Sequence, residues 1–288
     1  MKKRQTIIYI MSNQRSGSTL IENVLSKSLQ IVSVGEAYLL GGHIHKTGPG
    51  SAWDWNCSCG ESLLECDFWN KIYRNLNISN PQEIANTRII NPKRKKGNNK
   101  DKQKSNNSKA VSLMNQIYTA VFETTECDVL VDSSKEAFHG TSLYQNSPFN
   151  FKFIYLRRDL RAVSISKQKW WKRYGREHIS LVRFLLSNYR HRLKCWLMLR
   201  KVNKKDVFYL NYEDFFKNPQ HTLNDMSSFF GFDAYEMPEF MELNNDHTIA
   251  GTLNRFKKTK IEYDNRWLSI AKKRPLFNVL GYMLNKIG

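Results

Sequence analysis

The sequence predicts an α/β fold in which a central, mostly parallel sheet is flanked by helices on both faces. Short apolar, β-branched runs alternate along the chain with segments whose apolar residues recur at helical spacing. Hydrophobic residues make up 41% of the 288 residues, which is enough for a buried core. This length suits one large domain or two small ones, and of these we expect a single domain over residues 1–288.

The first predicted strand, residues 7–11, ends in a turn with the composition of an anion-binding loop. The turn reads SNQRSG, and an amphipathic helix follows from Ser18 and Thr19. Backbone N–H groups and the positive end of the helix dipole converge at such a turn, where Arg15 adds a charge. This strand–loop–helix order predicts a P-loop-type three-layer fold. A nucleoside-triphosphate loop would read GxxxxGK[ST], and this turn lacks its first glycine and its lysine.

Two further predicted strands deliver charged side chains to the sheet. Residues 29–36 end in Glu36, and residues 128–132 lead into Lys135. Ligands of open α/β sheets bind beyond the carboxyl ends of the strands. Glu36 is therefore a candidate general base, and Lys135 can neutralise charge on a transferred group. The alternatives are a surface glutamate that caps a helix near Ala37 and a surface lysine.

Residues 151–166 form a second strand–turn–helix unit. Arg158 at the strand end and Ser166 two helical turns later can close around one phosphate. Asp159 is placed to pair with Arg158 or Arg161 and to cap the helix. A structural ion-pair cluster is the alternative. Other helices are expected at residues 63–76, 110–124, 178–201 and 219–230, and another strand at residues 206–210.

The net charge of +19 indicates an acidic partner, such as a polyanionic cofactor, an anionic substrate, nucleic acid or a membrane surface. Part of this charge lies in residues 93–109, which hold eight Lys or Arg, one Asp and no apolar residue. We expect this stretch to be a solvated or disordered insertion. No aromatic residues interleave to stack on bases, so we expect no nucleic-acid partner.

Nowhere does the chain hold eighteen consecutive apolar residues, so it predicts no transmembrane helix. The apolar run after the basic start is only about six residues long, which argues against a signal peptide. We therefore expect a cytoplasmic protein. Residues 275–287 are amphipathic and either dock onto the domain or make a peripheral membrane contact.

A loop rich in Gly, His and Trp holds three of the five cysteines. Its candidate metal ligands are Cys57, Cys59 and Cys66, with His43 or His45. Their spacing matches no standard zinc finger, so we expect no metal; packed thiols or a labile disulfide are simpler. Cys127 and Cys195 are expected in the core. His247, in a later loop, is expected to be structural rather than catalytic.

Taken together, these motifs resemble the superfamily of sulfotransferases that use 3′-phosphoadenosine-5′-phosphosulfate (PAPS), over nearly the full chain. QRSGSTL is similar to the 5′-phosphosulfate loop, and LRRDLRAVSIS is similar to the 3′-phosphate motif, with Arg and Ser eight residues apart. VGEAYLL, CSCG with ECDFW, VDSSK, LNYEDF and HTIAGTLNRF also resemble the bacterial-type carbohydrate and protein sulfotransferase-like branch. That branch is related to the tyrosylprotein sulfotransferases.

The resemblance implies a role for each matching residue. The 5′-phosphosulfate would be bound by Arg15, Ser16, Gly17, Ser18, Thr19 and Leu20, and the 3′-phosphate by Arg158 and Ser166. Glu36 matches the catalytic base, and Lys135, with Arg15, would lie near the transferring sulfuryl group. Arg255 would reach the cofactor or an anionic acceptor. The resemblance would have Gly-Asn before Arg-Phe, and this chain departs from it with Gly251 and Thr252.

The implied reaction is sulfuryl transfer from PAPS to an acceptor hydroxyl, with 3′-phosphoadenosine-5′-phosphate (PAP) as product and no metal required. The aromatic and basic residues 170–176 fit a carbohydrate acceptor, because rings stack on sugar faces, but they also fit a peptide or a lipid glycan. Two alternatives belong to other classes: a P-loop nucleotide-dependent kinase, and a non-catalytic basic module that binds polyanions.

Overall fold

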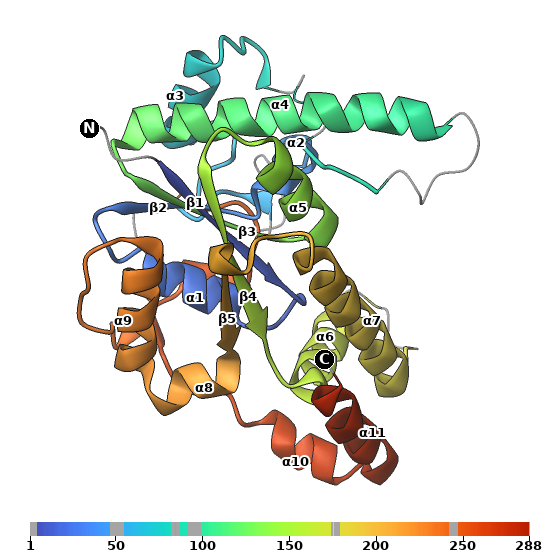
Figure 1. Cartoon of the computed structure of the whole chain (residues 1–288). Helices are drawn as coiled ribbons and strands as arrows, with labels where there is room; N and C mark the ends of the chain where they lie inside the picture. Colours follow the sequence, from blue (N-terminus) through green and yellow to red (C-terminus); the bar gives the residue numbers. More distant parts are fainter. Residues whose placement is uncertain are drawn as a thin grey trace.

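A five-stranded sheet lies at the centre of the protein in the computed structural model, which describes residues 5–46, 55–81, 84, 87–91, 99–173, 175, 179–241 and 247–287. The strand order is β2-β3-β1-β4-β5, and every pairing is parallel (Figure 1). The strands are β1 (Thr6–Ser12), β2 (Ile31–Gly35), β3 (Val129–Lys135), β4 (Asn150–Arg157) and β5 (Val207–Asn211). The predicted parallel sheet is confirmed.

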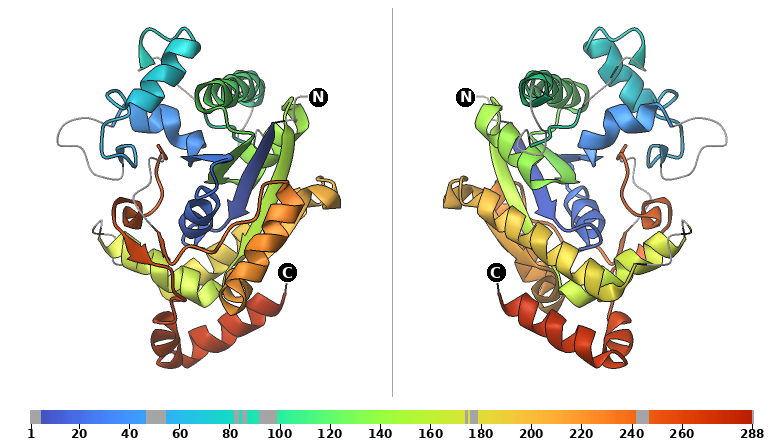
Figure 2. Two further views of the ribbon diagram at one scale, coloured as in Figure 1. Left: turned by 90° about the vertical axis from the view of Figure 1, so that its left-hand side faces the viewer. Right: turned by 90° about the vertical axis from the view of Figure 1, so that its right-hand side faces the viewer.

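Helices cover both faces of the sheet because alternate side chains of β1 are buried in two different clusters. Ile7, Tyr9 and Met11 pack into one cluster, and Ile8 and Ile10 into the other. Figure 2 shows the helical layers on either side of the sheet. The first face carries α3 (Asp67–Asn75), α4 (Asn99–Thr125), α5 (Ala137–Asn146) and part of α7 (Leu181–Leu199). The second carries α1 (Ser18–Leu25), α8 (Tyr212–Lys217) and α9 (Pro219–Phe230).

Short elements complete the described chain. They are η1 (Ala37–Leu39), α2 (Leu40–Ile44), η5 (Lys204–Asp206), β6 (Phe240–Met241), η6 (Leu253–Phe256) and β7 (Thr259–Lys260). The expected helix at residues 219–230 is α9, which ends at Gly231 in the left-handed conformation. The helix expected at residues 63–76 is shorter, because Cys66 is still extended and α3 begins at Asp67.

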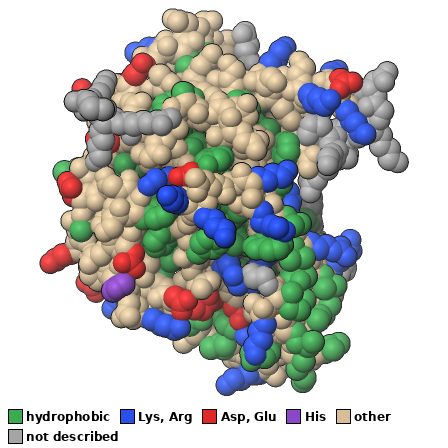
Figure 3. All heavy atoms as spheres, viewed as in Figure 1, with side chains coloured by type: hydrophobic (Ala, Val, Ile, Leu, Met, Phe, Trp, Pro, Cys, Tyr) green, Lys and Arg blue, Asp and Glu red, His purple; other side chains and the backbone are tan. Residues whose placement is uncertain are grey.

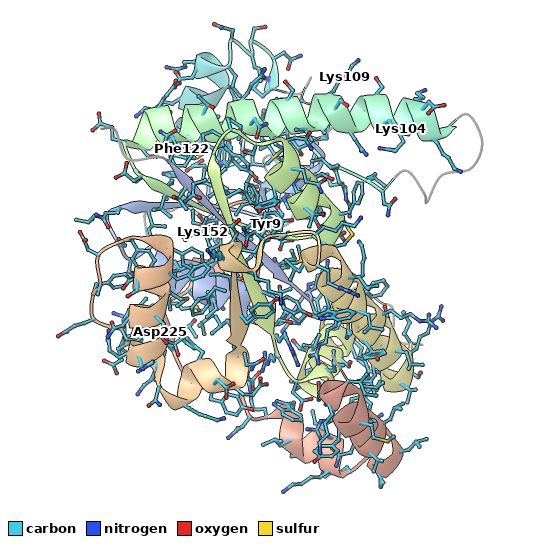
Figure 4. All side chains as sticks on the ribbon, in the orientation of Figure 1. Tyr9, Lys104, Lys109, Phe122, Lys152 and Asp225 are labelled. Carbon is cyan, nitrogen blue, oxygen red and sulfur yellow. The ribbon has the colours of Figure 1, made fainter. Side chains whose placement is uncertain are left out.

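The expectation of disorder in the basic stretch is wrong for residues 99–109, which form the first part of α4. Figure 4 shows Lys104 and Lys109 on this helix. A polar contact that the composition did not indicate fastens this part of the helix: the Asn107 amide oxygen accepts from the N–H of Ile90 at 3.0 Å, and the amide nitrogen donates to the Ile90 carbonyl at 2.7 Å. Extending an existing helix costs little once the buried part from Ala110 onward has formed. Residues 93–98 lie outside the described residues.

A third cluster joins α6 (Leu160–Lys172) and α7 to α10 (Trp267–Lys272) and α11 (Pro275–Lys286). Phe277 is buried in it, and Gly281 packs so closely on Arg161 that a Cβ would clash. The expected docking of residues 275–287 is therefore confirmed. Apolar side chains also remain on the outside, over the lower right of Figure 3; they include Leu276, Val279, Tyr282, Met283 and Ile287. Within the described residues, no helix is both long and apolar enough to span a membrane.

Candidate active site

The loop between β1 and α1 is shaped by two residues with positive φ, Arg15 at 71° and Gly17 at 94°. A Cβ on Gly17 would clash with the ring of Tyr212, so this position requires glycine. The carbonyl of Gly17 accepts from the N–H groups of Leu20 and Ile21 at 3.0 and 3.1 Å, which starts the helix. Ser16 and Ser18 are buried in the loop. The local chain thus forms the strand–loop–helix unit that the sequence predicts.

The two predicted phosphate motifs meet directly. Arg15 donates from Nε to the hydroxyl of Ser166 at 3.1 Å, across 151 residues of sequence. Arg158 Nη1 lies 3.5 Å from the carbonyl oxygen of Arg15. Burial lowers the pKa of Arg15, and the charges of Arg173 and Arg158 lower it further. The site is therefore strongly cationic where the ends of β1 and β4 lie side by side.

Arg158 has partners that the sequence did not indicate. Its guanidinium lies 3.4 Å from the Asp264 carboxylate and 4.2 Å from the centre of the Tyr212 ring. Asp159, expected to pair with Arg158 or Arg161, pairs with Arg161 at 2.6 Å and caps α6 by accepting from the Arg161 N–H. The alternative of an ion-pair cluster is thus true of Asp159 with Arg161, and Arg158 forms its own ion pair with Asp264 while it also reaches the loop after β1.

Glu36 and Lys135 form a buried ion pair, with 2.6 Å between Oε1 and Nζ. Their side chains are only 11% and 7% exposed, so neither is a surface residue. Glu36 follows β2 and Lys135 ends β3, and these strands are neighbours in the sheet. The negative charge of Glu36 also acts on the Arg15 guanidinium and raises its pKa. The structure therefore brings together the three residues predicted to be catalytic.

Residues 247–256 close the site from the C-terminal part of the chain. The carbonyl of Ile249 accepts from the N–H of Glu36 at 2.8 Å, and the N–H of Ile249 donates to the carbonyl of Val34 at 3.1 Å. A Cβ on Gly35 would clash with Ile249, so the close approach requires this glycine. A Cβ on Gly251 would lie 3.3 Å from the hydroxyl of Thr19. This segment therefore lies against both the end of β2 and the loop before α1.

Arg255, the last predicted cofactor residue, is buried near this junction. Its Nη1 would lie 3.6 Å from a Cβ on Gly251, which itself faces Thr19. Its Nη2 donates to the carbonyl of Asn56 at 2.8 Å. Arg255 is thus beside the loop that carries Thr19, and its cofactor role stays a prediction.

Sequence reasoning missed two buried carboxyl groups beneath the site. Glu22 on α1 accepts from the hydroxyls of Ser33 and Ser133, at 2.8 Å for Ser133, and thereby links α1 to β2 and β3. Asp132 on β3 accepts from the hydroxyl of Tyr118 at 2.6 Å, and burial raises the pKa of its carboxyl group to about 6. The sequence did hold one signal for a buried carboxyl group, because Asp132 is a charged residue at the end of an apolar run.

The cysteine-rich loop is arranged differently from the expectation. Cys57, Cys59 and Cys66 gather around His247, and His43 and His45 are not part of the group. His43 instead contacts the ring of Trp55, with ring centres 4.6 Å apart. All five cysteines are free thiols, so the disulfide alternative is not supported. Cys195 is buried as expected, but Cys127 is only partly buried at the end of α4 and is not a core residue.

Comparison with known proteins identifies the family. A sulfotransferase family model matches residues 8–236, which span β1 through α9. No curated protein matches the chain. Two solved structures are similar over most of their length. The sulfotransferase domain from the curacin biosynthetic pathway has a TM-score of 0.55 at 18% identity, covering 94% of this chain and 98% of its own. The sulfotransferase domain from the olefin synthase of Synechococcus PCC 7002 has a TM-score of 0.56 at 18% identity, covering 93% and 89%. The fold therefore matches known sulfotransferase domains, and the chain belongs to the sulfotransferase family.

Proposed function

We propose that this sulfotransferase moves the sulfuryl group of PAPS to the hydroxyl group of a carbohydrate acceptor. The observation that carries the proposal is the contact between the two motifs: the Arg15 guanidinium bonds to Ser166, and Arg158 reaches the loop of Arg15. A single adenylate with a phosphate at each end can then contact both motifs at once. The family assignment supports this reaction over a nucleotide-dependent kinase and over a non-catalytic polyanion-binding module.

Buried polar atoms near the loop support a bound donor. Ser16 Oγ and Arg158 Nε have no hydrogen-bond partner among the described residues. Buried polar groups are nearly always paired, so these atoms fit a ligand that brings acceptor oxygens. The phosphosulfate oxygens would meet the loop N–H groups, Arg15 and Ser16, and the 3′-phosphate would meet Arg158 and Ser166.

Glu36 takes the proton of the attacking hydroxyl in this proposal. Its carboxylate is held by Lys135 at 2.6 Å, which fixes its position in a buried site. The cations Lys135 and Arg15 stabilise negative charge on the sulfuryl oxygens and on the departing phosphate. When Lys135 turns toward the sulfuryl group, Glu36 is left free to accept the proton. Holding donor and acceptor in line lowers the entropic part of the barrier.

The aromatic end of α6 supports a sugar as acceptor. Trp170 is 37% exposed, and the neighbouring Arg173 is close enough for its charge to act on Arg15. A sugar ring stacked on an exposed indole would place a hydroxyl near the cationic loop. The two similar domains come from a curacin pathway and an olefin synthase, so a hydroxyl on an acyl chain is the competing acceptor.

The proposal has a direct experiment. The purified chain is incubated with PAPS carrying labelled sulfate and with panels of glycans, hydroxyacyl compounds and tyrosine peptides. Label transferred to a glycan, and lost in Glu36→Gln, supports the full proposal. Transfer only to a hydroxyacyl compound or a peptide would contradict the carbohydrate assignment, and absence of any PAPS binding would contradict the donor.

The proposal includes a peripheral contact with an anionic membrane surface through α11. The exposed face that carries Leu276, Val279 and Tyr282 adjoins basic residues at the α10–α11 turn, Lys272, Lys273 and Arg274. An exposed apolar helix face with basic side chains beside it is the combination that binds the interface of anionic lipids. A cytoplasmic protein would meet such a surface at the inner leaflet.

A further inference from the structure

The four-residue cluster in the cysteine-rich loop has the dimensions of a metal site. The Cys57 and Cys66 sulfur atoms are 3.6 Å apart, and those of Cys59 and Cys66 are 3.8 Å apart. Nδ1 of His247 lies 3.2 Å from Cys66 Sγ and 3.7 Å from Cys57 Sγ. All four donor atoms lie within 4.8 Å of one another. They therefore form a compact group with three sulfurs and one nitrogen.

The two sulfur–sulfur separations and the Cys57–His247 separation are close to those of tetrahedral zinc, and the Cys66–His247 separation is shorter. Zinc binds thiolate sulfur at about 2.3 Å and imidazole nitrogen at about 2.0–2.1 Å. At a tetrahedral angle, two sulfur ligands lie about 3.8 Å apart, and a sulfur and a nitrogen about 3.6 Å apart. A disulfide would instead need its sulfur atoms about 2.05 Å apart, and the three cysteines are free. Three thiolates with one imidazole are a ligand set of structural zinc sites.

The surroundings hold three of the four ligands in place, namely Cys57, Cys66 and His247. Cys57 lies in a tight turn, closed by the Gly60 N–H donating to its carbonyl at 2.9 Å. Cys66 caps α3, where its backbone N–H donates to Ser62 at 2.9 Å.

His247 is held from two sides. Its ring is stacked on Phe68 with centres 4.8 Å apart, and its carbonyl accepts from the Trp69 indole at 3.0 Å. Such fixed orientation of a ligand is typical of metal sites.

We propose that Cys57, Cys59, Cys66 and His247 bind one structural zinc ion, which fastens the cysteine-rich loop to the segment that closes the active site. Four ligands fill the tetrahedral coordination, so the ion has no open position for chemistry. The expectation of no metal came from the spacing of the cysteines with His43 and His45, whereas the histidine of the cluster, His247, is 181 residues away from Cys66.

The position of the cluster gives the ion a role in shaping the site. His247 is two residues before Ile249, which pairs with the end of β2 on both sides of Gly35. Ser58, between two of the cysteines, exchanges hydrogen bonds with the backbone of Thr248 at 2.8 and 3.1 Å. Asn56, before the first cysteine, accepts from Arg255 at 2.8 Å. Zinc would thus tie together the residues that position Glu36 and Arg255.

Metal analysis of the 288-residue chain tests the proposal. The protein is purified without chelator, and zinc is measured by mass spectrometry against protein concentration. We expect one zinc ion per chain, release of that zinc when the thiols are modified with a mercurial, and a lower melting temperature after chelation that added zinc restores. A chain without zinc that also fails to bind added zinc would overturn the proposal, as would a disulfide among these cysteines in protein kept under reducing conditions.

Variants separate metal binding from general packing. Cys66→Ser should lose the zinc, whereas Cys127→Ser, which removes a partly buried thiol outside the cluster, should keep it. His247→Cys keeps four ligands and should retain zinc, whereas His247→Ala should lose it. If Cys66→Ser fails to fold, cobalt substitution of the unmodified chain still shows whether the cluster binds a metal ion. A spectrum of tetrahedral cobalt with thiolate ligands supports the site, and His247→Cys should alter this spectrum. An octahedral cobalt spectrum overturns the site.

Discussion

Replacing Arg158 with alanine should weaken binding of PAP far more than binding of AMP, which lacks the 3′-phosphate. The reason lies in the geometry of the guanidinium. Its contacts to the Arg15 carbonyl and the Asp264 carboxylate are long, at 3.5 and 3.4 Å, and its Nε has no hydrogen-bond partner within the described part of the chain. These donors can therefore turn to a phosphate when one is present.

The size of the loss follows from the kind of bond that is removed. A hydrogen bond between charged groups contributes about 1.5–3 kcal/mol. The variant also leaves the Asp264 carboxylate without its Arg158 partner near the 3′-phosphate, which adds repulsion. A total of about 2–3 kcal/mol corresponds to a Kd for PAP that is raised ~30- to 150-fold. The Kd for AMP should change little, because AMP has no 3′-phosphate to contact Arg158.

Calorimetry with PAP and AMP on both proteins measures this difference, and the AMP titration also shows whether the variant is folded. Asp264→Asn is the matched control: it removes the competing charge without removing Arg158, so PAP affinity should stay equal or rise. Equal weakening of PAP and AMP in Arg158→Ala would refute the reasoning, because it would mean that Arg158 only supports the loop after β1. Weaker PAP binding in Asp264→Asn would also count against it.

Three further predictions concern catalysis, stability and surface binding. Glu36→Gln should lower kcat by about 10²- to 10⁴-fold without weakening the binding of PAP, because the amide keeps the shape but cannot accept the proton. A kcat equal to that of the wild type would exclude Glu36 as the base. Burial lowers the pKa of His139 to about 3. The unfolded chain therefore binds a proton below its ordinary pKa of 6.5 that the folded chain does not, and stability falls as the pH falls. Relative to His139→Asn, the wild type should lose about 2 kcal/mol of unfolding free energy between pH 8 and pH 5, as measured by urea denaturation; equal pH profiles would contradict this. Because Asp132 is present in both proteins, its opposite pH dependence cancels in the comparison. Leu276→Glu with Val279→Glu should abolish sedimentation with anionic vesicles while leaving PAP affinity unchanged, and unchanged sedimentation would exclude α11 as the contact.

The sheet and the two phosphate motifs were predictable because their signals are local. Each strand is a short apolar run, and each motif directly follows a strand, so the spacing within one unit fixes where Arg15, Glu36, Lys135 and Arg158 stand. Parallel strands then bring their carboxyl ends to one edge of the sheet. This rule is sufficient to place the four residues at one site without any knowledge of the loops.

The partners of these residues were not predictable, because they come from distant parts of the chain. Asp264 is 106 residues away from Arg158, and no pattern links the two. His247 joins the cysteines across 181 residues, whereas His43 lies close in sequence and takes no part. The first part of α4 is fastened by the contact between Asn107 and the backbone of Ile90, which composition cannot reveal. The partners of the site residues are therefore set by contacts between distant parts of the chain, which local sequence patterns do not indicate.

The central claim is that one adenylate with phosphates at both ends spans the loop of Arg15 and the start of α6. Calorimetry of the wild-type chain with PAP, and with ATP and magnesium, tests it directly. We expect tight binding of PAP without added magnesium and little binding of ATP. Binding of ATP with magnesium, together with no binding of PAP, would contradict it.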